Sequence, residues 1–182
     1  VGPDAANPEY TEAVMAAWKE RLPLYWGVEG LALHSYTWGG APKMALARDF
    51  GEKEYSNLLR ETLRMEDLIS RHSAIMDKYD PRKRVALVVD EWGVWLRPQA
   101  GSNPNFLRQD QSLRDAIAAA LNLNIFARHA ERVRLANIAQ MVNVLQAMIM
   151  TDGPRMHLTP TYHVFRMYVP FQDATLIPVD VD

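Results

Sequence analysis

The sequence predicts an α/β fold in which helices alternate with the strands of a parallel sheet. Segments with apolar residues three and four positions apart alternate with short apolar runs rich in β-branched residues. Doubly wound sheets and barrels both fit this alternation. At 182 residues, however, the chain is too short for a complete (β/α)₈ barrel, which needs roughly 250 residues. No glycine-rich phosphate loop follows any predicted strand, so a nucleotide-binding fold is disfavoured.

The first helix and the first strand are predicted from their start signals. Asn7 suits the N-cap and Pro8 the first helical position of a helix that runs to about Leu22. Residues 27–34 follow as a short apolar strand entered through glycines. The strand ends in the polar and aromatic cluster of residues 34–38.

A long helix and a buried strand follow. The apolar spacing over residues 52–79 predicts one amphipathic helix, which Asp80 and Pro81 terminate. Residues 84–89 are continuously apolar after the first, as in a strand buried on both faces of a parallel sheet. This strand ends at residues 90–92, Asp-Glu-Trp.

The last third of the chain predicts a loop, two helices and two strands. Residues 97–111 form a polar loop and residues 112–129 an Ala- and Leu-rich helix. Residues 131–140 are predicted to form the third strand, although their pattern also suits a helix. A short helix follows Thr159-Pro160 and runs to about residue 167, and residues 173–179 resemble the opening strand of a β-sandwich.

Composition and charge argue against several classes of protein. The formal net charge is -2 and basic residues are scattered, so we expect no nucleic-acid partner. No run reaches the roughly 18 apolar residues of a membrane span, so we expect no membrane partner. Cysteine is absent, which excludes thiolate metal sites. The histidines outside the first strand, which are His72, His129, His157 and His163, do not have the spacing of a metal site. We therefore expect neither a metal nor another cofactor.

The clearest candidate for chemistry is the acidic pair Asp90-Glu91. It follows an apolar run, so at least one carboxylate lies at the rim of a dry core, where it is costly unless it is paired or used. Trp92 and Trp95 flank Glu91, and an indole offers a flat apolar face to a sugar ring. A carboxylate in this setting suits glycoside hydrolysis. A structural role, in which the carboxylate caps a helix or binds an arginine, remains an alternative from spacing alone.

Polar residues at the ends of the other two strands could join this pair. His34 and Tyr36 are two positions apart and therefore point to the same side of a strand, from which both could reach Glu91. They could equally be a half-buried aromatic pair. Gln140, at the end of the third predicted strand, could donate to a sugar hydroxyl, but an isolated glutamine is more often a surface residue.

Three ordered segments resemble the α-L-arabinofuranosidases of glycoside hydrolase family 51. These segments are residues 33–36 (LHSY), 88–95 (VVDEWGVW) and 135–143 (LANIAQMVN). Residues 122–132 and 158–165 resemble connecting segments of the same family, so the likeness covers nearly the whole chain.

The resemblance implies a fold and a set of roles. Residues 1–170 would form the C-terminal portion of a (β/α)₈ TIM barrel, about strands six to eight, and residues 171–182 the start of a C-terminal β-sandwich domain. Glu91 matches the catalytic nucleophile and Trp95 a wall of the sugar pocket. By the same resemblance, His34 and Tyr36 match residues that line the sugar pocket, and Gln140 matches an amide that binds the arabinose.

The implied reaction releases terminal α-L-arabinofuranosyl groups from arabinan or arabinoxylan oligosaccharides by double displacement. The family carries its acid/base carboxylate in an Asn-Glu motif, and this chain has no Asn-Glu dipeptide. The first residue is not Met either, so we expect a fragment that needs the N-terminal part of the enzyme, present as a second chain of a nicked or split enzyme. Gly93 replaces an asparagine often found in the family, which affects the expected loop shape.

The resemblance also implies a homo-oligomer, and it fits either a cytoplasmic or a periplasmic or secreted location. Two alternatives stay open at this point. The chain could be a non-catalytic carbohydrate-binding or scaffold chain, or it could belong to a related enzyme of the same clan, such as a β-xylosidase or an endoglucanase.

Overall fold

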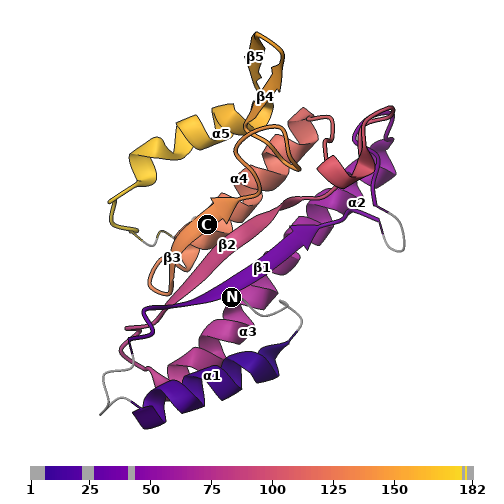
Figure 1. Ribbon diagram of the computed structural model, residues 1–182. Coiled ribbons are helices and arrows are strands. Elements are labelled where there is room, and N and C mark those ends of the chain that lie inside the picture. The colour runs from indigo at the N-terminus through magenta and orange to yellow at the C-terminus, as the bar shows by residue number, and fades with distance from the viewer. Residues whose placement is uncertain (1–6, 22–26, 41–43, 178, 180–182) are drawn as a thin grey trace.

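The computed structural model of the chain describes residues 7–21, 27–40, 44–177 and 179. Helices and strands alternate through the main body (Figure 1): α1 Pro8–Arg21, β1 Gly30–Thr37, α2 Glu52–Thr62, α3 Arg64–Tyr79, β2 Ala86–Val94, α4 Leu113–Arg128, β3 Val133–Ile138 and α5 Pro160–Tyr168. Two further strands and two short 3₁₀ helices complete the described elements: β4 Ile149–Asp152, β5 Arg155–Leu158, η2 Pro104–Phe106 and η3 Val169–Phe171.

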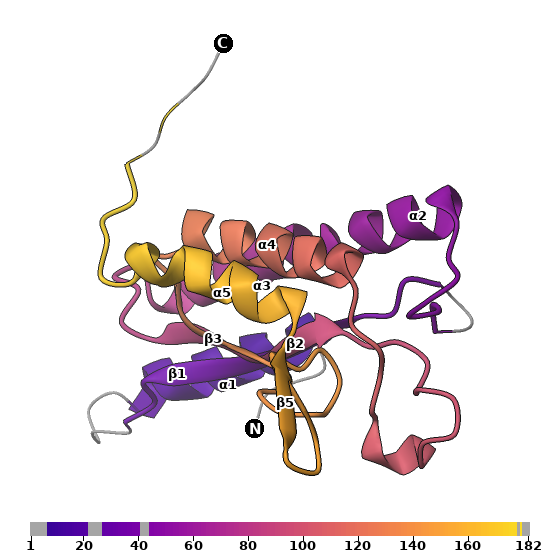
Figure 2. The ribbon, with the colours of Figure 1, turned by 90° about the horizontal axis from the view of Figure 1, so that it is seen from above.

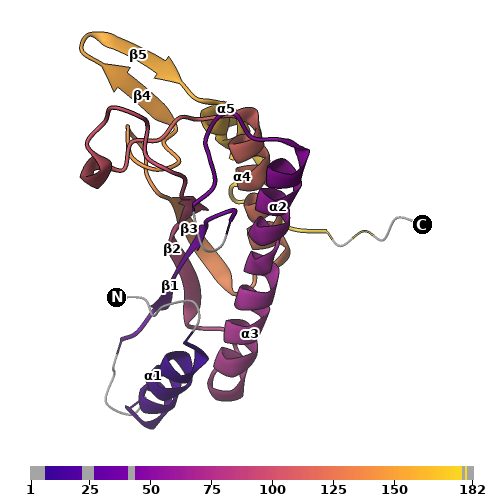
Figure 3. The ribbon, with the colours of Figure 1, turned by 90° about the vertical axis from the view of Figure 1, so that its right-hand side faces the viewer.

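The main sheet is parallel and has the order β1-β2-β3, so β2 is paired on both edges. Helices α2, α3, α4 and α5 lie on one side of this sheet, as Figures 2 and 3 show from two directions. Helix α1 packs against α3. The predicted α/β class is therefore confirmed. No described helix is long and apolar enough to cross a membrane.

The main core lies between the sheet and its helices. On β2 the helix-facing side chains are Leu87, Val89 and Trp92, all buried. Trp92 packs edge-on against Phe126 of α4 and in a stacked arrangement against Phe165 of α5. The apolar run of the sequence therefore becomes the central strand of the sheet.

An irregularity in the pairing of β1 with β2 decides where the acidic pair points. Ala32 lies opposite Val88, but His34 lies opposite Glu91, so β2 has one residue more than β1 between these two pairs. Such a bulge interrupts the alternation of side chains between the two faces of a strand. Asp90 and Glu91 are neighbours in the chain, yet both contact the His34 ring, so they lie on the same side of the sheet.

Two predicted elements differ from the structure in their extent. The helix expected over residues 52–79 is two helices that meet at Leu63. Here the Thr62 hydroxyl donates to the carbonyl of Leu58, which bends a helix, and the hydrogen bond from Leu63 N–H to Leu59 is long, at 3.3 Å. The ambiguous segment 131–140 does contain a strand, β3.

The polar residues expected after the strands instead lie within them, because β1 extends to Thr37 and β2 to Val94. Pairing continues past the apolar run, and Trp95 N–H still donates to the carbonyl of Thr37 at 2.9 Å. Backbone hydrogen bonds continue through this part of the sheet, where Trp92 and Val94 are also buried.

The β-sandwich strand expected over residues 173–179 is wrong for the described residues 173–177 and 179. They form no strand, and residues 172–177 run away from the body of the fold (Figure 2). A strand needs a neighbour for its backbone hydrogen bonds, and the described residues offer none there. Residue 178 lies outside the described part, as do Leu22 and the start of the chain.

The antiparallel hairpin β4-β5 is absent from the sequence prediction. It projects from the body of the molecule (Figure 1), and its turn contains Gly153 with a φ of 55°. The dipeptide Asp152-Gly153 is a strong hairpin signal, so the sequence did carry this information.

Candidate active site

Four polar side chains from β1 and β2 meet on one face of the sheet. The Tyr36 hydroxyl donates a 2.9 Å hydrogen bond to Glu91 Oε2. The His34 ring approaches both carboxylates, with Nδ1 3.5 Å from Glu91 Oε2 and Nε2 3.1 Å from Asp90 Oδ1. The structure thus brings together Glu91, His34 and Tyr36, as the two-residue spacing on β1 predicted.

Asp90 adds a second negative charge beside His34. Its Oδ1 is buried and accepts no hydrogen bond from the described residues. His34 and Asp90 are therefore close enough for an ion pair, but they do not form a well-aligned hydrogen bond. The side chain of Glu91 is 49% exposed. The side chain of Asp90 is 36% exposed, so Glu91 is the more accessible of the two carboxylates, and one oxygen of Asp90 is buried near the imidazole.

Tyr36 is held in its protonated form. Burial raises the pKa of the Tyr36 phenol well above its usual range, and the hydrogen bond to Glu91 and the charges of Glu91 and Asp90 raise it further. The hydroxyl therefore remains a donor to the Glu91 carboxylate at neutral and moderately alkaline pH. A donor of this kind fixes one carboxylate oxygen and leaves the other free to react.

An aromatic group lies next to these polar residues. Trp95 contacts Tyr36 edge-on, with ring centroids 5.0 Å apart and planes at 80°. Trp38 stacks on Trp95 with centroids 5.1 Å apart and planes at 11°. Trp95 is thus close to the site, as the sequence predicted, and Trp38 adds a ring that the prediction did not assign.

Two buried glutamines fix the end of β2. Gln146 Oε1 accepts from Val94 N–H at 2.8 Å, and its amide donates to the carbonyl of Asp115 and the hydroxyl of Thr161. Gln109 accepts from Leu96 N–H at 2.8 Å and donates to the carbonyl of Val94 at 2.9 Å. The amide groups of these glutamines bond to backbone N–H and carbonyl groups that a neighbouring strand would otherwise pair. They therefore hold the end of β2, just after Glu91, in place.

Gly93 lies between Glu91 and this support. Its φ is 143°, a value that favours glycine, and a Cβ at this position would lie 3.2 Å from Gln146 Oε1. Gly93 therefore makes a tight backbone contact within β2, at a position where the sequence predicted a loop. Sequence patterns cannot find Gln109 or Gln146, because a lone glutamine carries no recognisable spacing.

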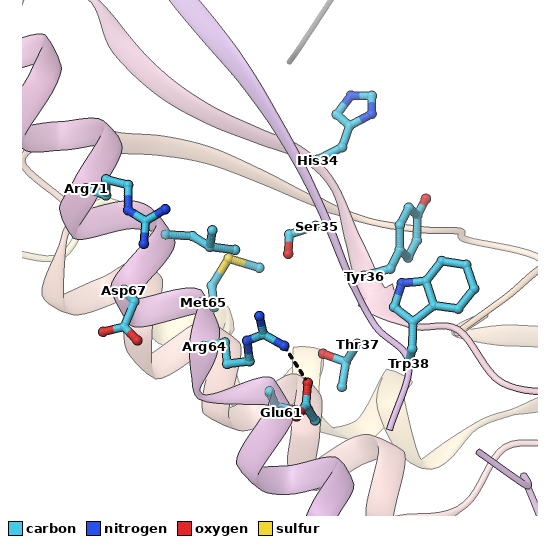
Figure 4. A pocket seen from close by; sticks show the side chains of 12 residues that line it. His34, Ser35, Tyr36, Thr37, Trp38, Glu61, Arg64, Met65, Asp67 and Arg71 are labelled. Carbon is cyan, nitrogen blue, oxygen red and sulfur yellow. Dashed lines mark hydrogen bonds and ion pairs between the residues drawn. The ribbon is translucent and has the colours of Figure 1, made fainter. Parts of the chain in front are cut away.

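A cavity of about 550 Å³ lies beside these residues, between β1 and helices α2 and α3 (Figure 4). His34, Tyr36 and Trp38 point away from the helices, whereas Ser35 and Thr37 point towards them. On the helix side the cavity is lined by charged and apolar residues, and Arg64 pairs with Glu61 at 2.9 Å. The cavity lies along the edge of β1 that no described strand covers.

Gln140 stands apart from this group. It is exposed beyond the end of β3, and its backbone N–H donates to the carbonyl of Val144 at 3.2 Å. Among the described residues no hydrogen bond joins its side chain to Glu91, and its role stays a prediction. The described His, Asp and Glu residues form no group of three or more that could hold a metal ion.

Sequence and structural relatives identify the class of protein. Residues 90–182, just over half of the chain, match the family "Alpha-L-arabinofuranosidase C-terminal domain". An intracellular exo-α-L-arabinofuranosidase of Bacteroides ovatus is 45% identical over 157 residues, which cover 85% of this chain and 30% of that protein. An intracellular exo-α-(1->5)-L-arabinofuranosidase of Streptomyces lividans is 30% identical over 71% of the chain and 22% of its own length.

Crystal structures of arabinofuranosidases are also similar to this chain. The GH51 arabinofuranosidase from Xanthomonas axonopodis pv. citri superimposes with a TM-score of 0.87 and 55% identity over 94% of this chain and 34% of the other. The arabinofuranosidase of Thermotoga maritima, solved as an arabinose complex, has a TM-score of 0.68 at 22% identity over 89% of this chain and 29% of the other, which shows the shared fold. This chain belongs to the family 51 α-L-arabinofuranosidases and corresponds to their C-terminal part. It spans between 22% and 34% of the length of these relatives.

Proposed function

We propose that the chain supplies the nucleophile of a retaining α-L-arabinofuranosidase, which releases terminal α-L-arabinofuranosyl groups from arabinan or arabinoxylan oligosaccharides. The observation that carries this proposal is the accessible carboxylate of Glu91, hydrogen-bonded by Tyr36 and approached by His34 within a family of this activity. A carboxylate with one oxygen fixed and the other free suits attack on an anomeric carbon.

In the proposed reaction the free oxygen of Glu91 attacks the anomeric carbon of the arabinosyl group. The bond from that carbon to the leaving oxygen breaks, and a carboxylic acid protonates this oxygen. An arabinosyl ester of Glu91 results. The same second carboxyl group, now ionised, takes a proton from water, which attacks the anomeric carbon and frees Glu91.

The second carboxyl group has to come from another part of the enzyme. Retention requires the two groups to be about 5–5.5 Å apart. Asp90 is an unsuitable candidate, because it directly precedes Glu91 on the same strand and its Oδ1 is buried near the His34 ring. We therefore propose that the N-terminal part, in the same chain or as a partner chain, contributes the acid/base carboxylate opposite Glu91.

In this proposal residues 1–170 are the last three units of a (β/α)₈ barrel and residues 171–182 lead into a β-sandwich. The parallel order β1-β2-β3, with one free edge on β1 and one on β3 among the described residues, supports it. Strands of the missing part would pair with both edges and close the barrel. The homo-oligomer implied by the resemblance stays a prediction.

The test uses the full-length enzyme with aryl α-L-arabinofuranoside, β-xyloside and β-glucoside substrates. We expect hydrolysis of the arabinofuranoside alone, with the α-anomer of arabinose formed first in an NMR time course. Glu91→Ala should abolish this turnover. Preferential cleavage of the xyloside or glucoside would instead assign a related enzyme, and binding of arabino-oligosaccharides without any hydrolysis would indicate a carbohydrate-binding chain.

A further inference from the structure

The imidazole of His34 lies between two carboxylates that are consecutive in the chain. Its Nε2 is 3.1 Å from Asp90 Oδ1, and its Nδ1 is 3.5 Å from Glu91 Oε2. The bulge in β2 makes this arrangement possible, because it places Asp90 and Glu91 on the side of the sheet from which His34 projects. Each nitrogen of the ring therefore faces an acidic oxygen.

The charges of these three groups fit a ring that carries a hydrogen on both nitrogens. A neutral imidazole has one N–H, so its other nitrogen would present a lone pair to a carboxylate, whereas the protonated ring can donate from both. Asp90 Oδ1 is buried without a hydrogen-bond partner among the described residues, and such an oxygen is costly unless a charge compensates it. An ion pair with His34 provides this compensation, because its attraction depends on distance more than on alignment.

Glu91 Oε2 thus has two neighbours that act on it differently. The Tyr36 hydroxyl donates to this oxygen at 2.9 Å and fixes its position. His34 Nδ1, at 3.5 Å, is too far away for a strong hydrogen bond but close enough for the charge of the ring to act on the carboxylate. Tyr36 therefore holds the carboxylate in place, and His34 affects the stability of its negative charge.

We propose that Asp90 is a positioning residue, which holds the His34 ring beside Glu91 and thereby assists the departure of Glu91 from the arabinosyl ester. The inference rests on the proposed function of Glu91. In this step the bond between Glu91 Oε1 and the anomeric carbon breaks and its electron pair stays on Glu91. The oxygen of a water molecule bonds to the carbon, and the proton of that water passes to the second carboxyl group. The His34 ring stabilises the carboxylate that forms.

The first step of the reaction should depend less on Asp90. Glu91 loses negative charge when it attacks the anomeric carbon, so a positive ring beside it gives no advantage there. Tyr36 also keeps Oε2 fixed when Asp90 is changed. Loss of the Asp90 charge is therefore expected to slow the second step and to leave the first nearly unchanged.

The test uses the full-length enzyme and an aryl α-L-arabinofuranoside with a nitrophenol leaving group. Such a leaving group makes the first step fast, so kcat reports the departure of Glu91, whereas kcat/KM reports its attack. For Asp90→Asn we expect kcat to fall about tenfold and KM to fall with it, so that kcat/KM changes within about twofold. Stopped-flow absorbance should show a burst of nitrophenol in this variant, because the ester accumulates.

A double-mutant cycle tests whether Asp90 acts through His34. In a His34→Phe background, Asp90→Asn should change kcat by less than about twofold, because the ring on which it acts is gone. Asp90→Ser also lacks the charge and answers the same question if Asp90→Asn does not fold. The control is Asp110→Asn, which breaks an ion pair with Arg48 in the loop after β2 and should leave both kcat and KM unchanged.

Equal falls in kcat and kcat/KM would overturn the role of Asp90, because a structural defect that lowers the active fraction lowers both. An unchanged kcat in Asp90→Asn, or a full tenfold loss in the His34→Phe background, would overturn it as well. Failure of the proposed function gives a different result, since the unmodified enzyme would then not hydrolyse the arabinofuranoside or Glu91→Ala would retain its activity.

Discussion

The hydroxyl of Tyr36 donates a 2.9 Å hydrogen bond to Glu91 Oε2, although the two residues are 55 positions apart in the chain. The parallel pairing of β1 with β2 brings them together, since His34 lies opposite Glu91 and Tyr36 opposite Gly93. The bulge in β2 places Glu91 on the side of the sheet from which Tyr36 projects. The contact therefore depends on the register of two strands and not on a local turn.

Removal of this hydroxyl tests whether it positions the carboxylate. A hydrogen bond to a charged group contributes about 1.5–3 kcal/mol. If Tyr36→Phe loses that stabilisation in the transition state, kcat/KM for an aryl arabinofuranoside falls about ten- to a hundredfold in the full-length enzyme. Steady-state kinetics at neutral pH measure the loss.

The matched control for this variant is Tyr168→Phe. The Tyr168 hydroxyl also makes a hydrogen bond, to Asn124 Oδ1 at 2.6 Å, but it lies on α5 away from the candidate site. We expect its kcat/KM to remain near that of the unmodified enzyme. If both variants lost activity equally, the effect of Tyr36→Phe would reflect general stability and not the position of Glu91.

Gly93→Ala should impair both stability and activity. A Cβ strains the backbone at a φ of 143° and presses on Gln146, which holds the N–H of Val94 directly after the site. A residue forced into such a conformation costs about 1–3 kcal/mol. Urea unfolding and kinetics of the full-length enzyme measure the two effects.

Gly101→Ala separates backbone strain from the contact with Gln146. Gly101 has a φ of 81°, but a Cβ there has no atom within 4 Å. This variant should lose stability while the active fraction keeps its kcat. Loss of kcat in Gly101→Ala, or full activity in Gly93→Ala, would contradict the role assigned to the end of β2.

Asp80 should make stability depend on pH. It is buried, and its Oδ2 accepts from Val85 N–H at 2.8 Å and from Arg132 at 3.2 Å. Burial alone would raise the pKa of Asp80, but the hydrogen bonds from Val85, Arg132 and Arg84 outweigh it and lower this pKa. Its stabilisation is thus complete above the ordinary pKa of about 3.9 and is lost as the pH falls through the lower folded value.

Asp80→Asn removes one of the two carboxylates that pair with the buried Arg132 and leaves Asp77 as the other. We expect it to lower the free energy of unfolding by about 3 kcal/mol at pH 7, and less as the pH approaches the folded pKa of Asp80. Asp152→Asn breaks an exposed pair with Arg155 and should cost under about 1 kcal/mol. Urea titrations at several pH values check both, and a constant difference between Asp80→Asn and the unmodified enzyme down to low pH would contradict the linkage.

The sequence predicted most of the fold because local patterns determine most of it. Apolar spacing and helix caps placed α1 and α4 to within a few residues, and the apolar run marked the centre of β2. The end of β2 was missed, because it is held by backbone pairing and by Gln109 and Gln146, which apolar patterns do not report. The break at Leu63 likewise depends on a single side-chain hydrogen bond from Thr62.

For the candidate site, sequence patterns found residue types and the structure supplied their relationships. Residues two apart on a strand share a face, so the pairing of His34 with Tyr36 was predictable. The common orientation of Asp90 and Glu91 was not, because it requires a bulge whose position depends on the partner strand. The stacking of Trp38 on Trp95 is also a contact between strands and is invisible to local spacing.

The product formed by Glu91→Ala with azide tests the central claim most directly. Removal of the side chain leaves a space on the face of the sugar where Glu91 would attack, and azide can enter it when the leaving group is activated. In the full-length enzyme with an aryl α-L-arabinofuranoside, we predict that activity is lost without azide, and that azide restores turnover with β-L-arabinofuranosyl azide as the product seen by NMR. Undiminished hydrolysis without azide, or formation of the α-azide, would contradict the assignment of Glu91 as the nucleophile.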